Sequence, residues 1–155
     1  VLFRSRASEQ QERRIMGYRS EVAYTIRFSD VGDNTTSRQS FYTFLAEAKC
    51  KPETASCFTD DDDYIRVDEK LLQINFFAES VKWYPEYNDV KCHELLLHMA
   101  QDWVDNKDAE GVIGYWFLRI GEESNDIEES YGGNWNSDWI QLHRSMELDW
   151  DTSPK

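Results

Sequence analysis

Cysteine is scarce in this chain, and so are long apolar runs. The 155 residues hold three cysteines, Cys50, Cys57 and Cys92, and no CxxC pair. An odd count without that pair predicts neither a disulfide framework nor a thiolate zinc site, and a reducing compartment is the simplest expectation. No run approaches the roughly 18 apolar residues of a membrane span, and residues 1–15 lack the apolar core of a signal peptide. We therefore expect a cytoplasmic protein without a membrane contact.

Basic residues are also few: 17 Lys and Arg stand against 30 Asp and Glu, which gives a formal net charge of -13. Nucleic acids and anionic membranes are bound chiefly by cations that neutralise phosphates, so this surface should repel both. Only a local basic pocket could override this repulsion. We expect no direct contact with nucleic acid.

Motifs for catalysis and metal binding are missing as well. The sequence has no glycine-rich phosphate loop, nucleophile elbow or HExxH motif. His93 and His98 lie five residues apart, off the spacing at which two imidazoles on a helix reach one metal, so His93 is expected at the surface or rim. Cys92 falls on an apolar helical stripe and is expected to be a core thiol. The sequence therefore predicts a non-enzymatic protein with no metal and no cofactor.

Aromatic residues, in contrast, are abundant at 14% of the chain, which is too many for a disordered acidic tail. The length fits one hydrophobic core. We expect residues 1–15 to be an N-terminal extension with Met16 as the natural start, residues 16–150 to form a single domain, and residues 151–155 to be a tail.

Hydrophobic periodicity predicts an α+β fold. Alternation over residues 21–28, 71–78 and 140–148 indicates half-buried strands, and the run 112–120 is apolar on both faces, as in a central strand. Apolar residues recur at helical spacing over 37–49 and 90–106. Residues 64–78 should form a hairpin around Asp68 and Glu69, and Ile127–Tyr131 a second hairpin arm. We predict a single domain with a largely antiparallel sheet and two helices packed on one face.

The stretch FLRIGEESNDIEESYGG at 117–133, the acidic hairpin, turns from apolar residues into carboxylates. Its simplest interpretation is a solvated hairpin that turns at Ser124–Asp126. A hard-cation site is a weaker possibility, because the spacing differs from that of a calcium loop. A third interpretation is a docking surface for a basic protein partner, since acids around apolar anchors suit such a partner. The candidate partner-binding residues are Glu122, Glu123, Asp126, Glu128, Glu129, Trp135 and Trp139. The run Asp60–Asp63 is a further acidic loop, expected to be solvated.

Aromatic and arginine side chains suggest an alternative, because rings stack on bases and guanidinium groups bind phosphate. Core or rim packing competes with this interpretation. The candidate residues for such a nucleotide-binding cleft, expected between subunits of a homo-oligomer, are Tyr18, Arg19, Trp83, Tyr84 and Arg119. Because Arg119 stands alone in the apolar run YWFLRI, it must either pair with an acid of the hairpin, such as Glu122 or Glu128, or face a cleft.

Three segments together resemble a family of small uncharacterised proteins of tailed bacteriophages and prophages: MGYRSEV at 16–22, VKWYPEYNDV at 81–90 and FLRIGEESNDIEES at 117–130. The similarity spans residues 16–131 and carries no established activity. It implies an accessory phage protein in the bacterial cytoplasm. In that context the expected function is inhibition of a host defence system through the acidic and aromatic protein-binding surface, with sequestration of a nucleotide signal as the alternative.

Overall fold

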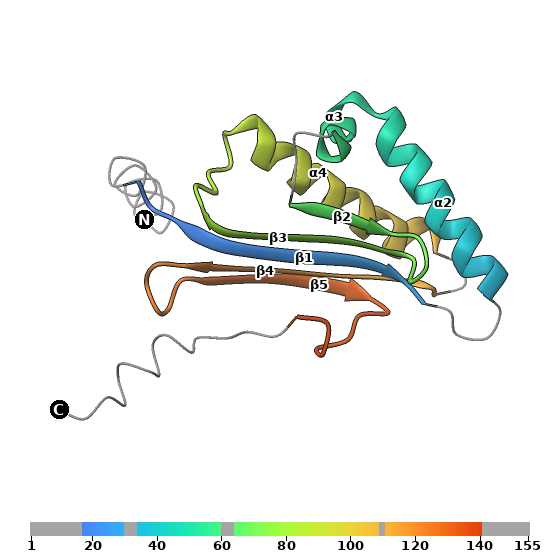
Figure 1. Ribbon diagram of the computed structural model, residues 1–155. Coiled ribbons are helices and arrows are strands. Elements are labelled where there is room, and N and C mark those ends of the chain that lie inside the picture. Colours follow the sequence, from blue (N-terminus) through green and yellow to red (C-terminus); the bar gives the residue numbers. More distant parts are fainter. Residues whose placement is uncertain (1–16, 30–33, 60–63, 109–110, 141–155) are drawn as a thin grey trace.

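The computed structural model describes residues 17–29, 34–59, 64–108 and 111–140 (Figure 1). The expected N-terminal extension, the Asp60–Asp63 loop, the strand over 140–148 and the tail lie outside the described residues, apart from Ile140. No described helix has the length and apolar character that crossing a bilayer requires.

The sheet has five antiparallel strands in the order β2-β3-β1-β4-β5. The strands are β1 (Ser20–Phe28), β2 (Ile65–Asp68), β3 (Gln73–Val81), β4 (Ile113–Gly121) and β5 (Ile127–Gly133). The predicted α+β fold class is therefore confirmed. Both predicted hairpins are present, β2–β3 and β4–β5, and the apolar run of β4 does lie inside the sheet, between β1 and β5.

The helices lie on one face of the sheet (Figure 1). They are α2 (Asn34–Cys50), the short α3 (Pro52–Ala55), which leads into a 3₁₀ turn at Ser56–Phe58, and α4 (Asn88–Asp102), which ends in a π turn at Trp103–Lys107. The two long helices were predicted, although each begins two or three residues earlier than its apolar pattern indicated.

The core fills the space between the helices and the sheet because the strands alternate in the expected way. Val22, Tyr24, Ile26 and Phe28 of β1 all point into it and are at most 3% exposed. Trp103 packs edge-to-face on Phe28. This face of β1 therefore forms part of the core.

The opposite face of the sheet carries the segment that follows β5 (Figure 1). Trp135 packs on the rings of Trp116 and Tyr131, with centroids 5.6 and 4.0 Å away. The Arg27 guanidinium lies 4.8 Å from the centre of the Trp139 ring. Residues 134–140 therefore cover part of this face, which explains why β4 is apolar on both sides.

Candidate functional site

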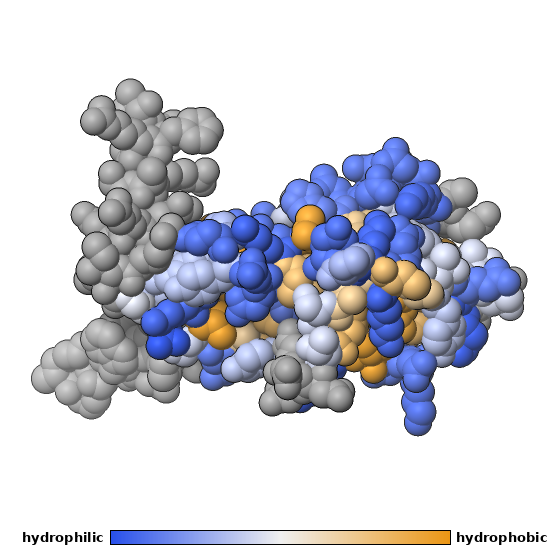
Figure 2. All heavy atoms as spheres, turned by 90° about the horizontal axis from the view of Figure 1, so that it is seen from above, coloured by the Kyte–Doolittle hydropathy of each residue, from blue (hydrophilic) through white to orange (hydrophobic). Residues whose placement is uncertain are grey.

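An open cleft of about 750 Å³ lies where the end of β3 meets the start of α4. Four aromatic side chains line it together with two cations, and the set is Tyr64, Phe76, Trp83, Tyr87, Arg19 and Lys82. Viewed over the helices, the surface is largely hydrophilic, with hydrophobic side chains showing between the hydrophilic ones (Figure 2). The cleft thus combines ring surfaces with local positive charge, although Asp89 also lies at its wall.

A backbone irregularity in β3 shapes the rim of this cleft. The pairing of β1 with β3 shifts register between Ser20 and Val22, and Ser80 has a φ of 53°. Few residues other than glycine adopt that left-handed conformation, and such irregularities are common beside functional sites. The Arg19 guanidinium donates to the Ser80 carbonyl at 3.0 Å, which fixes the cation at the rim.

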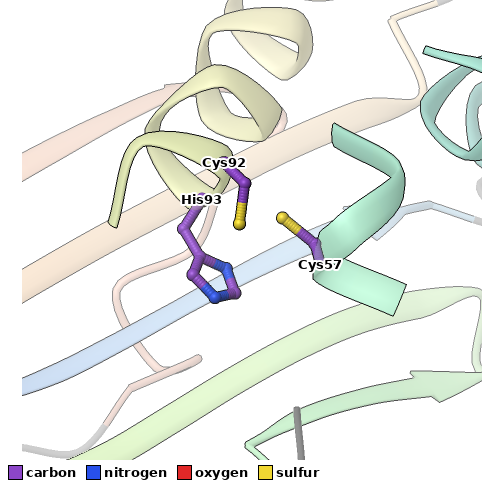
Figure 3. A group of neighbouring side chains, drawn as sticks. All are labelled: Cys57, Cys92 and His93. Carbon is purple, nitrogen blue, oxygen red and sulfur yellow. The ribbon is translucent and has the colours of Figure 1, made fainter. Parts of the chain in front are cut away.

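Three buried side chains with metal-ligating atoms lie together beside the cleft. They are Cys57 of the 3₁₀ turn and Cys92 and His93 of α4 (Figure 3), and their ligand atoms all lie within 4.8 Å of one another. Cys92 and His93 also line the cleft. The prediction that Cys92 is a core thiol is confirmed, since it is 5% exposed. The prediction that His93 lies at the surface or rim is wrong: it is 3% exposed.

The burial of His93 follows from its position between two layers. Its Nδ1 lies 2.7 Å from the Tyr24 hydroxyl of β1, and its ring packs on Phe76 of β3 at a centroid distance of 4.3 Å. The 3₁₀ turn with Cys57 lies on its other side. Because α4 is enclosed by both the sheet and this turn, it buries a wider face than its apolar stripe suggested.

Of the five residues predicted to form a nucleotide-binding cleft, the structure places only Arg19 and Trp83 at the open cleft. Tyr18 and Tyr84 are buried, and the Tyr84 hydroxyl donates to the Tyr18 carbonyl at 3.2 Å. Core packing is therefore the correct interpretation for these two tyrosines. The cleft also forms within one chain and does not need a second subunit. Sequence reasoning missed Tyr64, Phe76 and Lys82, for which no local motif gives a signal.

Arg119 does not face the cleft, and the predicted pairing with acids of the acidic hairpin is confirmed. Its guanidinium donates to both oxygens of Asp126, at 2.8 and 3.2 Å, and to Glu128 at 2.7 Å. Burial lowers the pKa of Arg119, but the hydrogen bonds that its guanidinium donates to Asp126 and Glu128, together with their negative charges, outweigh burial and hold the pKa above its ordinary value. Glu122 is not a partner of Arg119; it accepts the backbone N–H of Arg19 at 2.8 Å.

The remaining acids of the hairpin are also engaged within the chain, with one exception. Glu129 accepts the indole N–H of Trp116 at 2.7 Å, and Asp126 also accepts the Tyr18 hydroxyl at 2.6 Å. Among the five acidic candidates, only the Glu123 side chain accepts no hydrogen bond and forms no ion pair within the described part of the protein. Much of the acidic hairpin is therefore structural, as the isolation of Arg119 predicted.

The two tryptophans assigned to the same docking surface lie on the sheet face opposite the helices, with Glu129 and Tyr131. Trp135 and Trp139 are half-buried there by their contacts with Trp116 and Arg27. Tyr131 and Ile127 of β5 remain about half exposed, at 49% and 48%. Of the candidate acids, only Glu129 shares this face with the two tryptophans. Glu128 pairs with Arg119 on the face that the helices cover, and the other three lie around the hairpin turn, at the far end of β4 and β5 from residues 134–140.

No protein-family model, curated protein or solved structure matches this chain. The resemblance to phage proteins therefore remains a prediction from the three sequence segments.

Proposed function

We propose that this protein is a non-enzymatic binding protein whose cleft holds a small anionic ligand with a planar ring, as a nucleotide has. The observation that carries the proposal is the composition of the cleft. Its volume of about 750 Å³ falls within the range of roughly 300–1,000 Å³ typical of small-molecule sites. Tyr64, Trp83 and Tyr87 offer ring faces for stacking, and Arg19 and Lys82 offer positive charge to a phosphate.

The negative charge of the whole chain makes the two cations of the cleft stronger evidence for an anionic ligand. The chain has a formal net charge of -13, whereas the charged side chains that line the cleft are two cations and one acid, Asp89. An anion is attracted to such a place only through local contacts, because the field of the whole protein opposes it. This favours a compact ligand held by short contacts over an extended polyanion such as duplex DNA.

The resemblance to phage proteins gives the proposal its biological setting. In that setting the ligand is a nucleotide signal of a host defence system, and the protein sequesters it in the bacterial cytoplasm without turnover. A nucleotide binds while its concentration is low only if the site is already formed, and the Arg19 contact with Ser80 supports such a preformed rim.

The test is a thermal-shift titration against cyclic nucleotides, ADP-ribose, ATP, adenosine and inorganic phosphate. A ligand at 100 times its dissociation constant should stabilise the protein by about 2.7 kcal/mol. Tyr64→Ala should abolish the shift, whereas Tyr131→Ala should keep it. The two tyrosines are a matched pair, 51% and 49% exposed, of which only Tyr64 lines the cleft. Absence of a shift with every compound, or equal shifts in both variants, would contradict the proposal.

Turnover is read from the same incubations. Chromatography of the recovered nucleotide should return it unchanged; the appearance of a product would replace sequestration by catalysis.

A second candidate function is the docking of a basic host protein on the acidic hairpin. The observation in its favour is that the exposed side chains of Ile127 and Tyr131 lie on the edge strand β5 beside the acids. It ranks second because four of the five candidate acids already have partners inside the chain. Glu123→Lys combined with Tyr131→Ala should abolish salt-sensitive capture of a partner from a host lysate, while Tyr64→Ala should leave it intact. Unchanged capture by the double variant would remove this face from consideration.

A further inference from the structure

We propose that Cys57, Cys92 and His93 form a binding site for a transition-metal ion, with Zn²⁺ as the expected occupant. Among the described residues, these three bring their ligand atoms within 4.8 Å of one another, and all three are buried (Figure 3). The inference does not rest on the proposed function, because it needs only the geometry of these side chains.

The donor set selects the class of metal. Thiolate sulfur and imidazole nitrogen are the preferred ligands of Zn²⁺ and Cu(I), whereas Mg²⁺ and Ca²⁺ prefer oxygen. With Zn–S bonds of about 2.3 Å, two sulfurs on a tetrahedral ion lie about 3.8 Å apart. The present separations of up to 4.8 Å therefore need to close by about 1 Å, which small side-chain rotations supply.

The two supporting elements come from distant parts of the chain. Cys92 and His93 are consecutive in α4, so their side chains diverge by about 100° around the helix. They can reach one ion only from the two flanks of a helix face, and Cys57 approaches that face from the 3₁₀ turn (Figure 3). The ion would thus join the turn at Ser56–Phe58 to the first half of α4.

The imidazole is already held in place by its neighbours. The Tyr24 hydroxyl lies 2.7 Å from His93 Nδ1, and the Phe76 ring packs against the imidazole. These contacts fix the position and plane of the ring, and an ion bound at Nδ1 would take the place of the Tyr24 contact. The Cys92 thiol donates to the Asp89 carbonyl at 3.0 Å, a weak contact that a metal can replace.

Three protein ligands leave one position of a tetrahedral ion for another group. Since Cys92 and His93 line the cleft, that position would face it and be reached by water or by a donor atom of a bound molecule. A structural zinc site would be closed by four protein ligands, so this arrangement is of the open type.

Two neighbouring thiols could instead form a disulfide. Cys57 and Cys92 are not joined by a disulfide in this structure. A disulfide would use the two sulfurs and give the third donor, His93, no role, whereas a metal site uses all three. The presence of the imidazole beside both sulfurs is the reason to favour the metal.

The test is a Co²⁺ titration of the full-length protein under reducing conditions, followed by displacement with Zn²⁺. Cobalt bound by thiolates gives a charge-transfer band, and the intensity of this band reports the number of sulfur ligands. It also gives d–d bands, which report tetrahedral geometry. The wild-type protein alone therefore already tests the proposal. We expect one ion per chain, two thiolate ligands and full displacement by Zn²⁺. Absence of the bands, or an intensity that fits no thiolate, would overturn the proposal.

Matched variants then assign the ligands. Cys57→Ala, Cys92→Ala and His93→Gln should each lower the affinity for Co²⁺ at least tenfold. Cys50→Ala and His98→Gln are the controls, because both residues are exposed, and they should bind as the wild type does. Circular dichroism establishes that each variant is folded. Equal affinity for Co²⁺ in the controls and in the folded ligand variants would overturn the assignment. It would also be overturned if the reduced protein shows no cobalt bands and forms a Cys57–Cys92 disulfide in air.

Discussion

The ion pair of Arg119 gives the sharpest prediction about stability. The Arg119 and Asp126 side chains are each only 11% exposed, and they form a two-pronged pair with contacts of 2.8 and 3.2 Å. Glu128 contacts the same guanidinium at 2.7 Å but is 61% exposed. Arg119→Met removes the charge and keeps most of the apolar stem, so that the main change is the loss of this pairing.

The expected cost follows from what remains after the substitution. The Glu128 side chain can rotate out into the solvent, and an exposed pair of this kind contributes at most about 1 kcal/mol. The Asp126 side chain is buried and cannot do so, and breaking a buried pair by removal of one partner costs roughly 3–5 kcal/mol. The Tyr18 hydroxyl still donates to Asp126 at 2.6 Å, which offsets part of this. We expect Arg119→Met to lower the free energy of unfolding by about 3 kcal/mol and Glu128→Gln by less than about 1 kcal/mol.

The measurement is urea unfolding of the two single variants and of Arg119→Met combined with Asp126→Asn. The double variant should recover part of the loss, because it no longer leaves an unpaired charge at position 126. Since the pKa of Arg119 is raised, its contribution is complete below the ordinary arginine pKa and is lost only as the pH rises through the still higher folded value. Alkaline conditions up to about pH 11 should therefore not weaken it. An Arg119→Met variant as stable as Glu128→Gln would refute the reasoning.

Two further predictions concern α4 and the segment after β5. Burial, and then the charge of Glu128, raise the pKa of Glu94, while the charge of His98 lowers it. The neutral form of Glu94 therefore stabilises the folded state fully below about pH 4, and this stabilisation is lost as the pH rises through the raised pKa. Glu94→Gln should therefore resist urea better than the wild type at pH 7, with the difference vanishing near pH 4; a constant difference would contradict this. A Cβ at Gly114 would clash with the backbone that leads into Trp135. Gly114→Ala should therefore lower the free energy of unfolding in urea by about 1–3 kcal/mol and expose Trp135, which shifts its fluorescence emission to the red. An unchanged emission spectrum would contradict this prediction.

Local patterns in the sequence were sufficient to predict the sheet and the pairing of Arg119. Alternation of apolar residues predicted β1 because one face of that strand is buried. A period of two residues is the period of a strand, and it also determines which side chains point into the core. Arg119 could be assigned to the acids of its own hairpin because its charge cannot be lost and the nearest carboxylates follow within nine residues. Both inferences use contacts between residues that are close in sequence.

The cleft could not be predicted, because it depends on contacts between distant residues. The cluster beside it brings Cys57 together with Cys92 and His93, which follow 35 and 36 residues later, and no spacing motif spans such a gap. Its rim depends on the left-handed conformation of Ser80, although serine has no preference for that region. The apolar stripe of α4 placed His93 on the flank of the helix, where Tyr24, Phe76 and the Ser56–Phe58 turn together bury it.

The acidic hairpin and the cleft are connected through Arg19. Its backbone N–H donates to Glu122 of the hairpin at 2.8 Å, and its guanidinium donates to the Ser80 carbonyl at the cleft rim at 3.0 Å. Tyr18, next to it, donates to Asp126, the acid that Arg119 holds. The hydrogen bonds of the consecutive residues Tyr18 and Arg19 thus connect the buried ion pair to the wall of the cleft. The carboxylates that suggested a docking surface in the sequence therefore support the position of the one arginine that lines the cleft.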